Sequence, residues 1–110
     1  MINYTTPTIS LTVEGVDLSG MDVYVSLEQG QKELTKTGGD LIIEPIIGAE
    51  TTDTKITFTL TQEESASFDF GKSVSVQVNF INASGSRDAT EIKSFPVMRN
   101  LLDEVIEYGD

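Results

Sequence analysis

Apolar and polar residues alternate along several stretches of this chain, which is the pattern of a strand with one buried face. The most regular stretches are 8–14, 22–28, 55–61 and 73–80. In the first stretch Ile9, Leu11 and Val13 fall on one face, and the same spacing recurs in the other three. Glycine, aspartate and asparagine separate the stretches, and these residues favour turns. The pattern therefore predicts half-buried strands joined by short connections.

Three further stretches alternate less regularly. A short strand is expected around 33–36, and an irregular last strand from 87 to 97 follows a hairpin turn at 82–86. The segment 41–47 is apolar on both faces and contains Pro45, whose nitrogen cannot donate to a ladder, so we expect an irregular edge strand. Strand-like runs at roughly ten-residue spacing are typical of an all-β, Ig-like sandwich of two antiparallel sheets. The cysteines and tryptophan that mark many Ig cores are absent, so the strand order stays open.

The interior of this sandwich should be filled by alternate residues of four strands. The residues expected to point inward from facing sheets are Ile9, Leu11, Val25, Ile56, Phe58, Val76 and Val78. Between two of the strands, Thr61-Gln62-Glu63-Glu64 forms a capping box, in which Thr61 and Glu64 satisfy each other's amides. One helical turn ending near Phe68 should follow it.

The hydrophobic period changes after Pro96, from two residues to about three and a half. Asn100 is a good N-cap and Gly109 a good stop, so a short amphipathic helix is expected over 100–108. The residues that would share its apolar face are Met98, Leu101, Leu102, Val105 and Ile106. We divide the chain into a sandwich domain, 1–97, and this C-terminal element, 98–110. The apolar face is the candidate protein-interaction site: it either folds back over its own sandwich or docks on a neighbouring subunit.

Length and composition narrow the class of protein. A chain of 110 residues suits a single core, and without cysteine that core has no disulfide support. The N-terminus lacks the features of a signal peptide, and no apolar run approaches the ~20 residues of a membrane span. A net charge of -11 opposes binding to nucleic acid or to anionic membranes. We therefore expect a protein that is made in the cytoplasm and kept there until something carries it elsewhere.

The residues offer little for catalysis. The chain contains neither histidine nor cysteine, which removes the usual general base and the usual pairs of nucleophile and base. Two acidic pairs, Glu63 with Glu64 and Asp17 with Asp22, are better explained by helix capping and by solvated loops. We predict no enzyme activity, no metal and no cofactor.

Two binding roles stay open as alternatives. The loop 17–22 offers oxygens for calcium but differs from the twelve-residue loop of an EF-hand. A sugar platform would need an exposed aromatic ring. Since there is no tryptophan and Tyr24 lies within a strand, Tyr4, Tyr108 or a phenylalanine would have to supply it.

The order of strands and turns resembles a family of phage proteins. The resemblance lies in the stretches 6–18, 23–36, 56–64, 74–78 and 85–90, and it spans about residues 7 to 97. These are similar to the N-terminal domain of the upper baseplate proteins encoded by phages and prophages of Gram-positive bacteria. In that family the domain is Ig-like and docks the protein onto the central baseplate of the tail.

The resemblance implies a non-enzymatic structural protein of a phage particle. Longer family members continue into a stalk and receptor-binding parts, whereas this chain ends after one predicted helix, which favours a baseplate or tail adaptor or an accessory component. Its partners would be other virion subunits or copies of itself, met in the bacterial cytoplasm during assembly and then in the virion. A cell-surface or pilin-like sandwich is the alternative from another class.

Overall fold

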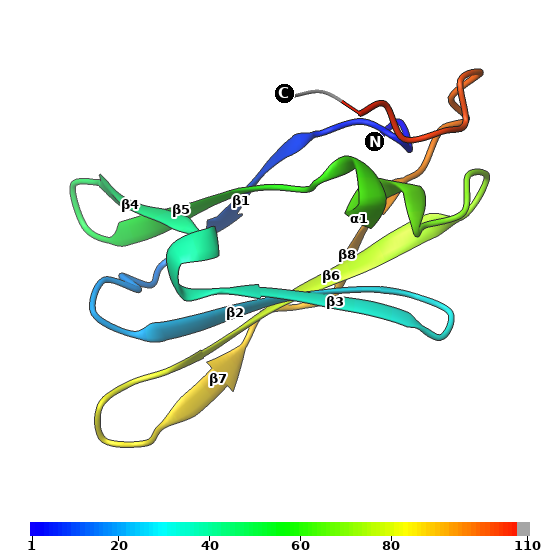
Figure 1. Cartoon of the computed structure of the whole chain (residues 1–110). Coiled ribbons are helices and arrows are strands. Elements are labelled where there is room, and N and C mark those ends of the chain that lie inside the picture. The colour runs from blue at the N-terminus through cyan, green and yellow to red at the C-terminus, as the bar shows by residue number, and fades with distance from the viewer. Residues whose placement is uncertain (108–110) are drawn as a thin grey trace.

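Two antiparallel sheets face each other in a computed structural model that describes residues 1–107 (Figure 1). The first sheet has the strand order β1-β5-β4. The second has the order β3-β2-β6, and both β7 and β8 pair with the far side of β6. The strands are β1 (Thr8–Val13), β2 (Asp22–Gln29), β3 (Lys32–Thr37), β4 (Ile42–Ile47), β5 (Thr52–Thr59), β6 (Ser73–Ile81), β7 (Arg87–Ala89) and β8 (Lys93–Pro96). The all-β prediction is therefore confirmed, with a sandwich-like arrangement of two layers.

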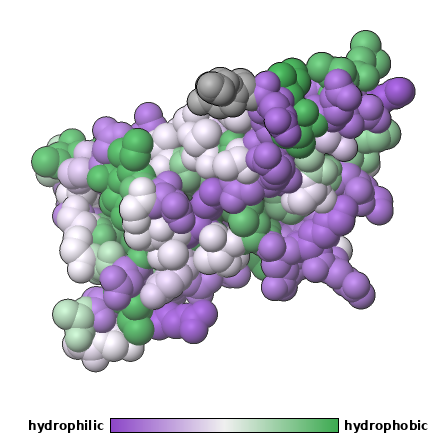
Figure 2. Space-filling model, viewed as in Figure 1, coloured by the Kyte–Doolittle hydropathy of each residue, from purple (hydrophilic) through white to green (hydrophobic). Residues whose placement is uncertain are grey.

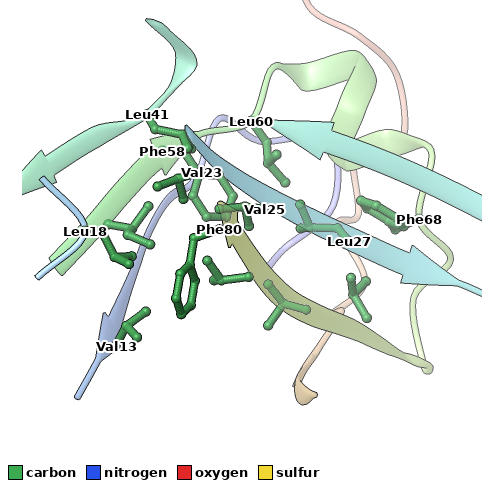
Figure 3. Close-up of a cluster of buried hydrophobic side chains, with 14 of the residues drawn as sticks. Val13, Leu18, Val23, Val25, Leu27, Leu41, Phe58, Leu60, Phe68 and Phe80 are labelled. Atoms are coloured by element: carbon green, nitrogen blue, oxygen red, sulfur yellow. The ribbon is translucent and has the colours of Figure 1, made fainter. Parts of the chain in front are cut away.

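The core lies between the sheets and is built mainly by alternate residues of β1, β2, β5 and β6, with further side chains from the connections (Figure 3). The central pair of the second sheet, β2 and β6, places Val25 opposite Val78 and Leu27 opposite Val76. Of the predicted inward residues, those buried in the structure are Val25, Ile56, Phe58, Val76 and Val78. Ile9 and Leu11 also point inward but stay only partly buried, because β1 lies at the margin of its sheet.

The connection from β5 to β6 contains the one α-helix of the described residues, α1 (Gln62–Ala66). The predicted capping box is confirmed: the Glu64 amide donates to Thr61 Oγ1 at 3.1 Å, and the Thr61 amide donates to Glu64 Oε1 at 2.8 Å. No helix in the described part of the chain is long and apolar enough to span a bilayer.

Two predictions about the outer strands are also confirmed. β4 pairs only with β5, so it is the edge strand that Pro45 indicated. A 3-10 turn, η1 (Gly38–Asp40), leads into it from β3. The irregular final strand is divided into β7 and β8, which both pair with β6 on either side of the break at 90–92.

The predicted C-terminal helix is wrong for the residues that the structure describes. Residues 100–107 follow bends without helical hydrogen bonding, and Tyr108 and Gly109 lie outside the described residues. The capping interaction of Asn100 does form, since its Oδ1 accepts from the Leu102 amide at 3.0 Å. The segment is shorter than the ~12 residues that an unsupported helix needs, and the acidic Glu107 at its end opposes the helix dipole. A satisfied cap therefore does not start a helix here.

Candidate protein-interaction site

The two ends of the described chain lie side by side above the sheets (Figure 1). Ile2 and Met98 form a parallel bridge, in which the Asn3 amide donates to the Met98 carbonyl at 3.1 Å and the Met98 amide donates to the Met1 carbonyl. The terminal ammonium of Met1 donates to the Pro96 carbonyl at 2.9 Å. The first three residues thus run beside, and parallel to, the chain that follows β8.

Beyond the bridge, the C-terminal segment is anchored by two amide side chains. Asn3 is buried, and its Oδ1 accepts from the Asn100 amide while its carbonyl accepts from Asn100 Nδ2, both at 3.1 Å. Farther along, the Gln62 side chain at the start of α1 accepts from the Ile106 amide at 2.8 Å and donates to the Ile106 carbonyl at 2.9 Å. These polar contacts fix the main chain of the segment on its own domain.

The five apolar side chains predicted for the interaction face remain exposed on this fixed segment. Their exposed fractions lie between 38% for Val105 and 88% for Leu101, and Ile2 adds a sixth exposed side chain beside Met98. Without a helix they do not share one helical face. We call the set the chain-end surface: Ile2, Met98, Leu101, Leu102, Val105 and Ile106. In Figure 2 apolar residues gather along the C-terminal segment, at the upper right, between hydrophilic ones.

The chain-end surface divides into two parts. Val105 and Ile106 line an open groove of about 640 Å³ with residues from the end of β5 and the start of α1. Met98, Leu101 and Leu102 lie nearer the N-terminal bridge. Next to them the Arg99 guanidinium sits 5.9 Å from the centre of the Phe70 ring, and Phe70 is itself 53% exposed. The place of Phe70 follows from the connection after α1, which leaves the interior at that point.

A second apolar area lies at the opposite end of the first sheet. Ile42, Ile46 and Ile47 of β4 are exposed, the last of them by 82%. Figure 2 shows this area at the left, over the end of the molecule that carries β4. The sequence pattern indicated it, since 41–47 is apolar on both faces and an edge strand cannot bury both.

A polar and aromatic cluster occupies the outer face of the second sheet. Tyr24 is 41% exposed and lines an open pocket of about 330 Å³ with Asn79 and Arg87. The Arg87 guanidinium donates to Asn79 Oδ1 at 3.1 and 3.3 Å. Sequence reasoning set Tyr24 aside because it lies within a strand. Because its neighbours Val23 and Val25 point into the core, Tyr24 turns its ring to the outer face.

The acidic residues considered for chemistry have local structural partners. Asp17 Oδ1 accepts from the Ser19 amide at 3.0 Å, and this hydrogen bond lowers the pKa of Asp17. Burial raises the pKa of Glu64, but hydrogen bonds from Lys36 and Thr61 outweigh it and leave that pKa below its usual value. Among residues 1–107 no group of three or more acidic side chains is placed to hold a metal ion. These carboxylates order a turn and a helix start.

The described residues thus expose an apolar surface at the chain ends, a second one on β4, and an aromatic cluster around Tyr24. No family model, curated protein or solved structure matches this chain.

Proposed function

We propose that this chain is a non-enzymatic structural component of a phage or prophage particle, a baseplate or tail adaptor or an accessory piece, with an Ig-like domain. It acts by packing against neighbouring subunits. The observation that carries the proposal is the chain-end surface, whose apolar side chains are exposed although hydrogen bonds hold their main chain in place. An exposed apolar area on the surface of a folded domain is typical of a docking site.

The setting of this surface supports a protein partner. Asp103, Glu104 and Glu107 are exposed beside the apolar residues, and the chain as a whole carries a net charge of -11. Such an acidic rim repels nucleic acid and anionic lipid, while an apolar centre with a charged rim is the usual composition of a protein interface. The phage setting comes from the resemblance over residues 7 to 97.

The proposal is tested by co-expressing the chain with the proteins encoded by its neighbouring genes and recovering complexes by affinity. We expect a tail or baseplate protein to be retained by the parent chain and lost from a Leu101→Asp, Leu102→Asp double variant. Ile47→Asp is the matched control, since Ile47 is almost as exposed as Leu101 but lies on β4. Retention of the partner by the double variant would reject the chain-end surface. Neighbouring genes unrelated to tails, with no complex formed, would reject the particle role.

Carbohydrate binding is a second candidate, and the cluster around Tyr24 favours it. An exposed ring beside an amide and a guanidinium offers one stacking face and several hydrogen-bond groups, which is what a sugar ring requires. Titration with a panel of oligosaccharides should then shift the NMR signals of Tyr24 and Asn79, and Tyr24→Phe should weaken binding less than Tyr24→Ala. A panel that leaves these signals unmoved would reject this candidate.

A further inference from the structure

The outer edge of β1 is open for pairing. The Leu60 amide donates to the Pro7 carbonyl at 3.1 Å, which fixes the alternation of the ladder between β1 and β5. By that alternation Ile9, Leu11 and Val13 bond to β5, whereas the amides and carbonyls of Thr8, Ser10 and Thr12 point away from it. Within residues 1–107 these outward groups have no hydrogen-bond partner in the main chain or the side chains. The side chains agree with this assignment. The Thr8 and Thr59 hydroxyls lie 3.2 Å apart, and side chains lie closest in pairs whose main chains do not bond to each other.

The edge of β4, by contrast, is blocked by a proline. The Gly48 amide donates to the Thr51 carbonyl at 2.9 Å, and alternation from this pair turns the nitrogen of Pro45 outward. The proline therefore removes no bond from the ladder with β5 but takes one donor from the free edge. This is a common protection against unwanted strand pairing.

Charges or short length protect the two edges of the second sheet. β3 carries Lys32, Glu33 and Lys36, and charged residues along an edge discourage pairing. On the other side, β7 and β8 have three and four residues and are separated by a break. Between Thr8 and Val13, β1 has no charge, no proline and no break, so it is the one unprotected edge among the described strands.

A groove with a mixed lining runs behind this edge. Ile9 and Leu11 point toward the core but stay half-exposed. The groove, of about 230 Å³, separates β1 from the second sheet; Leu11, Val76 and Val78 contribute apolar surface to it, and Glu91 and Lys93 contribute one charge of each sign. A strand added beside β1 would extend the sheet and cover these side chains with its own apolar face.

We propose that the occupant is a second copy of this chain, paired antiparallel through β1 about a two-fold axis at Ser10. The residues Thr8-Ile9-Ser10-Leu11-Thr12 read as hydroxyl, aliphatic, hydroxyl, aliphatic, hydroxyl from either end. Pairing about Ser10 sets Thr8 opposite Thr12 of the second copy and Ile9 opposite Leu11. The free amides and carbonyls of Thr8, Ser10 and Thr12 then face those of Thr12, Ser10 and Thr8 of the second copy. Each of these three pairs can form two main-chain hydrogen bonds, about six in all.

Symmetry and charge distinguish a second copy from a foreign strand. About a two-fold axis each residue of β1 meets a residue of the same strand, so β1 must be complementary to itself, and its alternation of hydroxyl and aliphatic residues satisfies this. Two chains of net charge -11 repel each other, so they should meet where charge is lowest. In this register Glu14, the acid next to β1 in the chain, falls opposite Thr6 of the second copy, and no acid faces another along the paired strands. Glu91 and Lys93, which line the groove behind β1, carry opposite charges. The pairing needs no phage particle, so it can hold or fail independently of the function proposed above.

Sedimentation of charge variants tests the pairing. The parent chain should dimerise at about 0.5 mM. A high concentration is needed because an interface below ~1,200 Å² usually binds weakly. Ser10→Lys and Ser10→Asp each place like charges across the axis and should weaken association about tenfold or more, and mixing the two variants should restore it. Thr57→Lys, which adds the same charge on the same face one strand inward, should associate like the parent. A monomeric parent, an unaffected Ser10→Lys, a mixture that stays dissociated, or an equal loss in Thr57→Lys would each overturn the proposal.

Hydrogen exchange gives an independent reading within the same strand. The amides of Ile9 and Leu11 bond to β5, so they should be protected at any concentration. The amides of Thr8, Ser10 and Thr12 should exchange quickly in dilute monomer and slowly at concentrations where the dimer is populated. Fast exchange of these three amides in the associated state would show that the copies meet elsewhere and would overturn the proposal.

Discussion

The central pair of strands and the C-terminal segment are held by opposite means. β2 and β6 bury Val25, Leu27, Val76 and Val78 between the sheets, and their outer faces are polar or half-exposed. Residues 98–107 do the reverse: side-chain amides hold their main chain, and their apolar side chains face solvent. The first arrangement stabilises the whole fold, because apolar burial is its main driving force. The second positions a surface at little cost to the core.

Removing a large side chain from the interior should have the largest effect. Phe58 of β5 is 2% exposed, and Phe58→Ala should lower the free energy of unfolding by about 3 to 5 kcal/mol. Urea denaturation monitored by circular dichroism measures this loss. Phe70→Ala serves as the control, since that ring is 53% exposed and should cost little. Equal losses in the two variants would contradict the contrast between interior and surface.

The helix start should contribute less. Thr61→Ala removes the side-chain cap of α1 and should destabilise the domain by about 1 kcal/mol. Thr35→Ala, on the exposed face of β3, is a suitable comparison in the same denaturation experiment. A loss at Thr61 no greater than at Thr35 would mean that the capping box is not needed for stability.

Acid should reveal the ion pair that joins β3 to α1. Lys36 Nζ lies 2.8 Å from Glu64 Oε1, and the pKa of Glu64 is lowered below 4.5 in the folded protein. A lowered folded pKa stabilises the protein above the unfolded pKa and loses that contribution as pH falls through the folded pKa. The difference in stability between the parent and Glu64→Gln should therefore shrink as the pH falls through and below the usual pKa of a glutamate side chain. Glu63→Gln, on the same helical turn, is the control variant, because the Glu63 carboxylate forms no hydrogen bond within residues 1–107.

The smallest global effect is expected at the C-terminal anchor. Gln62→Ala removes both hydrogen bonds to Ile106 and should leave the free energy of unfolding within about 0.5 kcal/mol of the parent. Locally, the Ile106 amide should exchange with solvent much faster, which NMR can follow residue by residue. Glu63→Ala, on the same helix start, is the control. An unchanged Ile106 amide would show that other contacts hold the segment.

The sequence predicted the strands well and the C-terminal segment poorly, for one physical reason. In Val23, Val25 and Leu27 the period of two reports burial on one face of a sheet, and the structure buries all three. From Met98 to Ile106 a helical period predicted a helix that does not form, and the hydrogen bonds of Asn3 and Gln62 decide the path of the chain instead. These partners lie far away in sequence, so no local pattern predicts them. The five apolar residues proposed for an interaction face are exposed, and their part in an interaction stays a prediction.

The contact between the chain ends also affects the order in which parts of the protein can fold during synthesis. The hydrogen bond from the Met1 ammonium to the Pro96 carbonyl joins residues 95 positions apart. At a synthesis rate of about 5 to 20 residues per second, the first residues wait roughly 5 to 20 seconds before their partners exist. Ile2 lacks its neighbour Met98 for that whole interval, whereas β1 lacks its partner only until β5 (Thr52–Thr59) is made. The second sheet has to wait for β6 (Ser73–Ile81), so it forms after the first, and the contacts of residues 1–3 are among the last to form.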